Sequence, residues 1–339
     1  MNCSSLYLAE FKQGLLSIES EAFCCCISMK ELILPDSIQR VGKHAFKENT
    51  GLRNATLPTG LEVVGEEAFL GCTSLQDLSV IGNADEDALK EKATSPMARS
   101  IHPRCFFGCR NLLLVNLRGA IFYSIGFCAF QLCVSLREVQ LNESLVAISE
   151  GAFKECRNLR KVLCASNLKR IESQAFKDCK KLESINLPET LDHIGKEAFR
   201  HCKSLKTIHL HGGIECIEQS VFFLCKSLSL IILPANLKWI AKNAFAYCSK
   251  LEHIVLPETL ERIEGWAFSF CTKMQSINFP SSLEFVEKTA FREVDSTLFA
   301  YEFKEKWRLK GLNVNGKKKR VKSDDVPQKN KFFPAINNK

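Results

Sequence analysis

The feature that most constrains the fold of this chain is a motif that recurs at a nearly constant interval. Aligned on a phenylalanine, the unit reads L-x-x-I-x-x-x-A-F-x-x-C-x-x-L-x-x-I-x-L-P, and twelve copies follow one another. The phenylalanines are Phe23, Phe46, Phe69, Phe106, Phe130, Phe153, Phe176, Phe199, Phe222, Phe245, Phe268 and Phe291. Ten of the eleven intervals are 23 residues, if one of 24 is admitted, and the exception is 37 residues. A short unit cannot bury such an apolar set alone, whereas stacked copies bury it against each other, so the sequence predicts a solenoid.

Within each unit, one segment has the pattern of a half-buried strand. The stretches LKTIHL, LEHIVL and LESINLP alternate apolar and polar residues with a period of two. One such strand per coil would stack in parallel on the next at about 4.8 Å. We expect a second short extended segment at L-x-x-I before the phenylalanine and little regular helix. The predicted fold is a stack of loop-rich coils with parallel β-strands, about twelve 23-residue repeats long.

The unit resembles the BspA-type leucine-rich repeat. The resemblance rests on the A-F-x-x-C-x-x-L core and the I-x-L-P strand end, and it covers about residues 10 to 310. It implies a leucine-rich repeat solenoid used for adhesion or protein binding, often on the surface of bacteria and protists, without enzymatic activity.

The repeat also sets the expected organisation of the chain. The expected segments are a half-coil cap at 1–17, the solenoid at 18–294 with an inserted loop at about 82–100, a short C-terminal cap at 295–315 and a basic disordered tail at 316–339. The inserted loop is either a partner contact or a tolerated insertion. Phe299, Phe303 and Trp307 recur at four-residue spacing, which is typical of one face of a capping helix.

Charge is distributed unevenly along the chain. The net charge is +8, and residues 304–339 hold twelve Lys or Arg against three Asp or Glu, which leaves about −1 for the rest. The solenoid thus has no overall basic excess, and we expect no nucleic-acid binding by it. The tail has the composition of a nuclear localisation signal, of a tether to anionic surfaces or of a solubilising end. Its basic residues are Lys317, Lys318, Lys319, Arg320 and Lys322.

Ten of the seventeen cysteines occupy the third position after the phenylalanine. They are Cys26, Cys72, Cys109, Cys133, Cys156, Cys179, Cys202, Cys225, Cys248 and Cys271. Stacked equivalent positions have parallel Cβ vectors, which is the wrong geometry for a disulfide, so we expect buried free thiols. Asn49 replaces cysteine in the second coil, which indicates a position that requires a small side chain. His201, directly before Cys202, falls at a variable repeat position and is given no special role.

No pattern for metal binding or catalysis stands out. His209 and His211 are two residues apart on one expected strand, but His253 lies two coils further on, about 10 Å away and too far to share a metal. The chain has no phosphate-binding glycine loop, nucleophile elbow or H-E-x-x-H motif. We therefore expect no enzymatic activity, no cofactor and no metal site.

The outward positions of the expected strands are polar in most coils and apolar in two adjacent ones. The candidate partner-binding residues are Thr207, His209, Leu230, Ile232, His253 and Val255. An apolar spot with a polar border is typical of a binding hot spot. We therefore predict a monomeric, non-enzymatic scaffold that binds a protein partner of unknown identity through its exposed β-face.

Two alternatives to this function stay open: cell-surface adhesion, and nuclear or nucleic-acid association through the basic tail. No signal sequence and no run of about eighteen apolar residues is recognised. We therefore expect a cytoplasmic or nuclear location, with the cell surface as the alternative.

Overall fold

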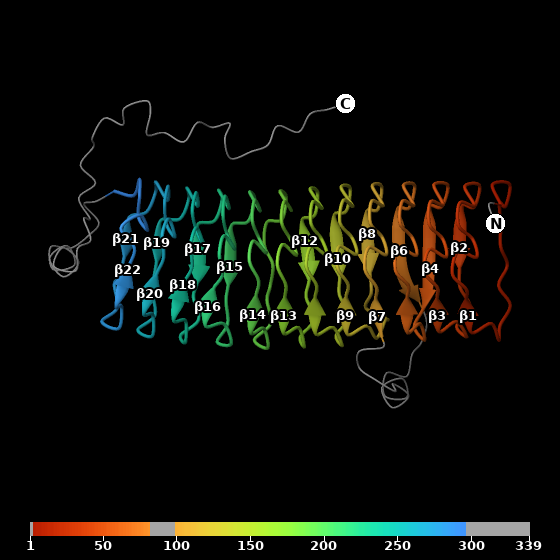
Figure 1. The fold of residues 1–339 in the computed structure, drawn as a ribbon, viewed down its shortest axis with the longest axis horizontal. Helices are drawn as coiled ribbons and strands as arrows, with labels where there is room; N and C mark the ends of the chain where they lie inside the picture. Colours follow the sequence, from red (N-terminus) through yellow and green to blue (C-terminus); the bar gives the residue numbers. More distant parts are fainter. Residues whose placement is uncertain (1–2, 82–98, 296–339) are drawn as a thin grey trace, which may run out of the picture. The chain divides into compact units, whose positions relative to one another are not determined.

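The computed structural model describes residues 3–81 and 99–295, and all structural statements below refer to these residues. They belong to a compact unit that spans Met1–Val294, in which coil follows coil along one axis (Figure 1). Every strand pairing is parallel, and no helix occurs in the described part of the chain. The predicted parallel-strand solenoid with a spacing of about 23 residues is therefore confirmed.

Two ladders of short strands run along the stack. The first ladder is built from the segment before each phenylalanine. Its strands are β1 (Ser17–Ile18), β3 (Arg40–Val41), β5 (Val63–Val64), β7 (Ser100–Ile101), β9 (Ser124–Ile125), β11 (Ala147–Ile148), β13 (Arg170–Ile171), β14 (His193–Ile194), β16 (Cys216–Ile217), β18 (Trp239–Ile240), β20 (Arg262–Ile263) and β22 (Phe285–Val286). The first eight form one sheet and the last four another.

The second ladder follows the conserved-spacing leucine of each unit. Its strands are β2 (Glu31–Ile33), β4 (Asn54–Pro58), β6 (Asp77–Ile81), β8 (Leu114–Asn116), β10 (Glu138–Gln140), β12 (Lys161–Leu163), β15 (Thr207–His209), β17 (Leu230–Ile232), β19 (His253–Ile254) and β21 (Ser276–Ile277). The strands from β2 to β12 form one sheet, and β15 with β17 and β19 with β21 form two pairs. The register keeps equivalent repeat positions opposite each other, as where Thr207 pairs with Leu230.

A column of stacked phenylalanine rings fills the centre of the coils. Each repeat phenylalanine stacks on the next, with ring centroids 4.9–5.7 Å apart from Phe23 to Phe291. The ten rings from Phe46 to Phe268 are fully buried. The aliphatic residue five positions before each phenylalanine is buried in all twelve coils, from Ile18 to Val286. The repeat pattern thus marks the core correctly.

The inserted segment leaves this column intact. Phe69 and Phe106, on either side of it, stack at 4.9 Å with an interplanar angle of 8°. Ile101 pairs with Val64 of the preceding coil, so the chain re-enters the stack in register. Residues 82–98 of the predicted loop lie outside the described residues, as do Phe299, Phe303, Trp307 and the basic tail.

At the other end, residues 3–17 contact the first coil. The ring of Phe11 packs edge-on against Phe23 at 5.4 Å. The Ser37 hydroxyl accepts a hydrogen bond from the Gly14 N–H at 3.0 Å and donates to the Leu15 carbonyl at 2.8 Å. The cap predicted at 1–17 stays a prediction.

The corner that carries each phenylalanine uses left-handed backbone on both sides of the ring. Glu197 and His201, two residues before and after Phe199, have φ values of 59° and 64°. This conformation costs a residue with a side chain about 1–2 kcal/mol. The cost is offset because the N–H of Glu197 donates to the Gln219 carbonyl at 3.0 Å and that of His201 to the Phe223 carbonyl at 2.8 Å. The corners thereby form a third line of hydrogen bonds between coils.

The repeat cysteines are free and buried, as predicted, and the structure adds a reason for them. The Cys202 Sγ donates to the Phe176 carbonyl of the preceding coil at 3.3 Å, and the same bond recurs for nine of the ten cysteines. In the second coil, Asn49 Nδ2 donates to the Phe23 carbonyl at 2.8 Å. Burial raises the pKa of the Cys202 thiol well above its ordinary value, so the donor proton stays in place. The position therefore requires a small donor and not merely a small side chain.

Replacing Cys202 with alanine is expected to lower the free energy of unfolding by about 1 kcal/mol, because the Phe176 carbonyl loses one of two donors. Replacing Cys202 with serine is expected to cost less, since its hydroxyl can donate to the same carbonyl. Urea unfolding of the purified variants measures both values. Equal losses for alanine and serine would contradict the donor role.

Candidate partner-binding face

The outward side chains of the second ladder carry the six candidate residues. In β15 and β17 the first and third residues are exposed, while the middle residues Ile208 and Ile231 are buried. Leu230 and Ile232 are 51% and 47% exposed, and Val255, directly after β19, is 75% exposed. Thr207, His209 and His253 are also exposed. The predicted orientation of these side chains is confirmed.

The strand register brings the candidates together in two columns. Thr207 lies opposite Leu230, and His209 opposite Ile232. β19 continues the ladder with His253, which pairs with Ser276 and has its Nδ1 2.8 Å from the Ser276 Oγ. The apolar spot therefore extends over adjacent coils and has polar residues on either side.

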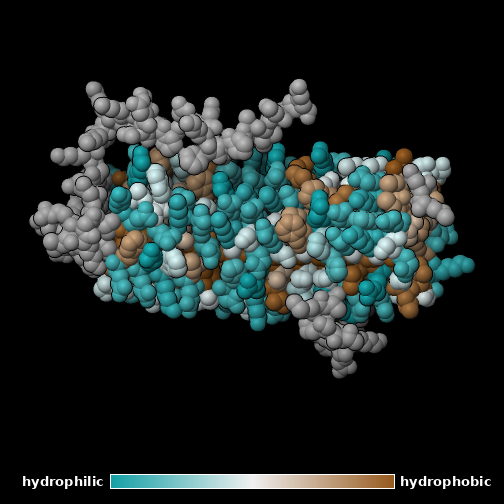
Figure 2. Space-filling model, in the orientation of Figure 1, coloured by the Kyte–Doolittle hydropathy of each residue, from teal (hydrophilic) through white to brown (hydrophobic). Residues whose placement is uncertain are grey.

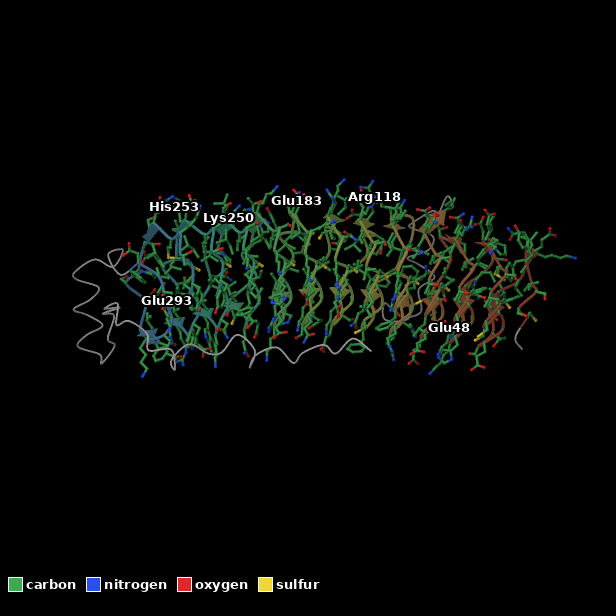
Figure 3. The ribbon with its side chains drawn as sticks, turned by 90° about the horizontal axis from the view of Figure 1, so that it is seen from above. Glu48, Arg118, Glu183, Lys250, His253 and Glu293 are labelled. Carbon is green, nitrogen blue, oxygen red and sulfur yellow. The ribbon has the colours of Figure 1, made fainter. Side chains whose placement is uncertain are left out.

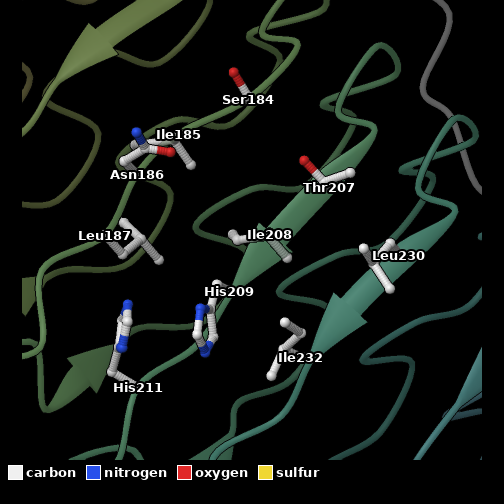
Figure 4. Close-up of a pocket in the computed structure, with 10 residues that line it drawn as sticks. All are labelled: Ser184, Ile185, Asn186, Leu187, Thr207, Ile208, His209, His211, Leu230 and Ile232. Carbon is white, nitrogen blue, oxygen red and sulfur yellow. The ribbon is translucent and has the colours of Figure 1, made fainter.

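A shallow pocket lies at one end of this surface. Its volume is about 390 Å³, and Figure 4 shows its lining drawn from three neighbouring coils. Four of the six candidates line it, namely Thr207, His209, Leu230 and Ile232. His253 and Val255 are not among its lining residues and continue the face beyond it.

The pocket coincides with a weak point in the second ladder. Between β12 and β15 the ladder has no strand in the described chain, and Ser184 pairs with Thr207 only through an isolated bridge. Ser184 and Asn186 place short polar side chains there, whereas the next coils have Leu230 and Ile232. The hollow thus has a polar side and an apolar side.

His211 also lines the pocket, where sequence reasoning did not place it. Its ring stacks on His209 with centroids 4.2 Å apart and an interplanar angle of 30°. In the neighbouring coils the equivalent position is Pro188 or Pro234. The exception to the I-x-L-P ending was the available signal. Among the residues that the structure describes, no group of three or more His, Cys, Asp or Glu side chains is arranged to hold a metal ion.

His201, given no role from sequence, has a specific partner. Its Nδ1 lies 3.0 Å from Asp178 Oδ1 of the preceding coil. Burial raises the pKa of Asp178, but the hydrogen bond from His201 and the nearby positive charge outweigh it and leave that pKa below its ordinary value. The pair is a structural contact between two corners and does not involve the Cys202 thiol.

A second exposed cluster lies on the first ladder. Trp239, Arg262 and Phe285 occupy paired positions in β18, β20 and β22. The Arg262 guanidinium lies 5.6 Å from the Trp239 ring and 4.2 Å from the Phe285 ring, so the three side chains form a cation–π column. Trp239 and Phe285 are 41% and 37% exposed. The 23-residue spacing aligns these residues, and that alignment could have revealed the column.

The candidate face and the phenylalanine corners lie on different edges of the solenoid. Figure 3 shows His253 and Lys250 along one edge and Glu48 and Glu293, which follow repeat phenylalanines, along the opposite edge. Figure 2 shows a mostly hydrophilic surface with hydrophobic residues gathered toward the N-terminal end. Exposed apolar side chains of that end include Tyr7, Leu16 and Ile33.

A search for membrane-crossing segments among the described residues finds no helix with the length and apolar character that crossing requires.

Comparison with known proteins identifies a family. A profile described as "BspA type Leucine rich repeat region" matches residues 1–86, 99–209 and 169–298 in six copies. No curated protein sequence matches the chain significantly.

Three solved structures illustrate the similarity of fold. A leucine-rich repeat protein from Bacteroides ovatus is 23% identical, with 82% of this chain and 80% of that chain covered and a TM-score of 0.48. A leucine-rich repeat protein from T. pallidum is 27% identical, covering 45% of this chain and 71% of that chain at a TM-score of 0.43. A leucine-rich cell surface protein from Faecalibacterium prausnitzii is 19% identical, covering 78% and 85% at a TM-score of 0.42.

Proposed function

Since the chain belongs to the BspA-type leucine-rich repeat family, we propose that it is a non-enzymatic scaffold that binds a protein partner. The binding surface in this proposal is the outward face of β15, β17 and β19 with Val255. Each coil packs only against its neighbours, so outward residues can differ from coil to coil without disturbing the core. The family thus supplies a stable support on which a specific surface can be built.

The observation that carries the proposal is the exposed apolar cluster of Leu230, Ile232 and Val255 beside a pocket. These three side chains are 51%, 47% and 75% exposed, at positions that are polar in most coils. Burial of such a cluster in a complex releases water from apolar surface, which is the main favourable term in association. The hydroxyl, amide and imidazole groups of the pocket provide directional contacts around it.

The combined substitution Leu230→Asp and Val255→Asp is expected to weaken partner binding at least tenfold, about 1.4 kcal/mol, because it places carboxylates where apolar surface is to be buried. The melting temperature is expected to change little, since both side chains point away from the core. Quantitative pull-down followed by titration with the captured partner measures the effect.

The matched control is Ile33→Asp with Ile81→Asp. These isoleucines are 66% and 61% exposed on β2 and β6 of the same ladder, far from the candidate coils in the sequence. This control variant is expected to bind the partner as the unmodified chain does. Unchanged binding by the Leu230/Val255 variant, or an equal loss in the control, would reject the site.

The place of action belongs to the same proposal. Family membership favours adhesion at a cell surface, whereas the basic composition of Lys317–Lys322 favours a nuclear location. Imaging of the tagged chain with and without residues 316–339, combined with surface labelling of intact cells, separates the cell surface, cytoplasm and nucleus. The tail lies outside the described residues, and its nuclear role stays a prediction.

A further inference from the structure

A strongly basic edge runs along the solenoid, between the phenylalanine corners and the second ladder. In each coil it consists of the fourth, fifth and seventh residues after the phenylalanine, which lie between and beside the buried cysteine and leucine. Over the eleven coils from Phe23 to Phe268 these positions hold thirteen Lys or Arg and only two acidic residues, Glu183 and Glu252. The basic edge comprises Lys30, Arg53, Arg110, Arg137, Arg157, Arg160, Lys180, Lys181, Lys203, Lys206, Lys226, Lys250 and Lys273.

Most of these charges have no counter-ion on the protein. Arg157 pairs with Glu155 at 2.7 Å and Lys206 with Glu183 at 2.8 Å. Within the described residues, the other eleven basic side chains form no ion pair. Lys203, Lys226, Lys250 and Lys273 are exposed in four successive coils. Their positive potentials therefore add along the edge.

The compensating acidic residues lie elsewhere in each coil. The four positions that start seven residues before the phenylalanine, which contain the first ladder, hold ten Asp or Glu against six Lys or Arg. Glu261 and Glu264 beside β20 are examples. The near-zero charge of the repeat region thus results from two segregated stripes and does not indicate a neutral surface.

The geometry of the edge points to a linear polyanion as its ligand. Successive coils repeat at about 4.8 Å, so the row offers ammonium groups at regular short intervals along a straight line of coils. A flexible or compact anion would contact few of them, whereas an extended anionic chain can contact many at once. We propose that the basic edge binds an acidic polysaccharide.

The side chains between the lysines favour a polysaccharide over a nucleic acid. The edge positions include Ser204, Ser227, Ser249 and Thr272, and none of them in the described coils is aromatic. Hydroxyl groups suit the hydroxyls of sugars, while single-stranded nucleic acids are bound largely by stacking bases on aromatic rings. The surface lacks the stacking platforms of a nucleic-acid site and has the charge that a sulfated or carboxylated polysaccharide needs.

Heparin serves as the probe, with binding to the full-length chain measured over a range of salt concentrations. The triple substitution Lys203→Glu, Lys226→Glu and Lys250→Glu is expected to weaken heparin binding at least tenfold and to reduce the dependence of log Kd on log salt. Circular dichroism verifies that the variant is folded. Leu230 and Val255 are untouched, so failure here leaves the proposed protein-binding face separately testable.

The matched control is Lys196→Glu, Lys242→Glu and Lys288→Glu. These lysines are exposed three residues before a repeat phenylalanine, on the other side of the corner, and change the net charge by the same amount. Both triple variants are also measured with Lys317, Lys318, Lys319, Arg320 and Lys322 replaced by glutamine, so that binding by the tail is removed. The control variant is expected to retain its affinity for heparin in both settings.

Three results would overturn the proposal. Equal weakening in both triple variants would mean that only net charge matters. Heparin binding that disappears with the tail substitutions alone would assign it to the tail. Tighter binding of single-stranded polyuridylate than of heparin at the same salt, lost in the Lys203/Lys226/Lys250 variant, would assign the edge to a nucleic acid.

Discussion

Replacing Phe199 with alanine is expected to lower the free energy of unfolding by about 3–5 kcal/mol. The ring is fully buried and stacks between Phe176 at 5.4 Å and Phe222 at 5.7 Å. Its removal leaves a cavity in the middle of a continuous column, where the neighbouring rings are held by their own coils and cannot move in to fill it. Urea-induced unfolding followed by circular dichroism measures the loss.

Two further variants make this result interpretable. Phe199→Leu keeps most of the apolar volume and is expected to cost less than the alanine variant. Phe23→Ala removes a partly exposed ring of the first coil and is also expected to cost less. Since a solenoid is stabilised by contacts between neighbouring coils, the central defect is also expected to separate unfolding into two phases. Equal losses at Phe23 and Phe199 would contradict the importance of the buried column.

The second large effect is expected at Glu67, which joins three coils electrostatically. Its carboxylate lies 3.1 Å from His44 Nε2, 3.0 Å from Lys47 Nζ and 3.1 Å from Arg104 Nη1, and its side chain is 13% exposed. Replacing Glu67 with glutamine is expected to lower the free energy of unfolding at pH 7 by about 1.5–3 kcal/mol, because charged hydrogen-bond partners lose their acceptor. Urea unfolding at several pH values measures this effect.

The sign of the pH dependence follows from the pKa of Glu67. Burial raises this pKa, but the hydrogen bond from Lys47 and the charges of Lys47 and Arg104 outweigh burial and hold it below the ordinary value of 4.5. The unfolded chain therefore binds more protons in acid than the folded chain does. The stabilisation is complete above the ordinary carboxyl pKa and is lost as pH falls through the lower folded pKa. The difference between Glu67→Gln and the unmodified chain is expected to shrink over that range.

Glu183→Gln is the control for this experiment. Glu183 pairs with Lys206 at 2.8 Å, but the two side chains are 47% and 62% exposed, so solvent screens the interaction. No measurable change in stability is expected. A Glu67→Gln effect that is as small, or that does not vary with pH, would show that the three-coil contact contributes little.

Sequence predicted the core because the solenoid repeats one solution. Phe199, Ala198 and Leu205 each occupy a position that recurs in register, and all three are buried. The outward exposure of Leu230 and Val255 followed from the period of two in the strands. A repeated pattern thus fixes which side chains point inward, even though each strand has only a few residues.

Features that depend on differences between coils were missed. Cys202 and Asn49 share both small size and a donor group, and the sequence could not show that only the donor has a partner in the preceding coil. The pocket beside Ser184 requires strand pairing to weaken there, which no local pattern encodes. The basic edge was hidden because summing charge along the chain cancels stripes that folding separates in space.

The in-register pairing of the coils has a consequence for how such a chain can change its length. Strand partners lie one repeat apart, as Arg262 and Phe285 do, and the corner hydrogen bonds follow the same spacing. A duplication or deletion of one whole coil therefore restores every contact at the new junction, whereas any other length misaligns the strands. The bypass from Phe69 to Phe106 shows the alternative, in which extra residues leave the stack and the count of coils is unchanged. Binding surfaces on this scaffold can thus be lengthened in whole coils while the joints between them stay the same.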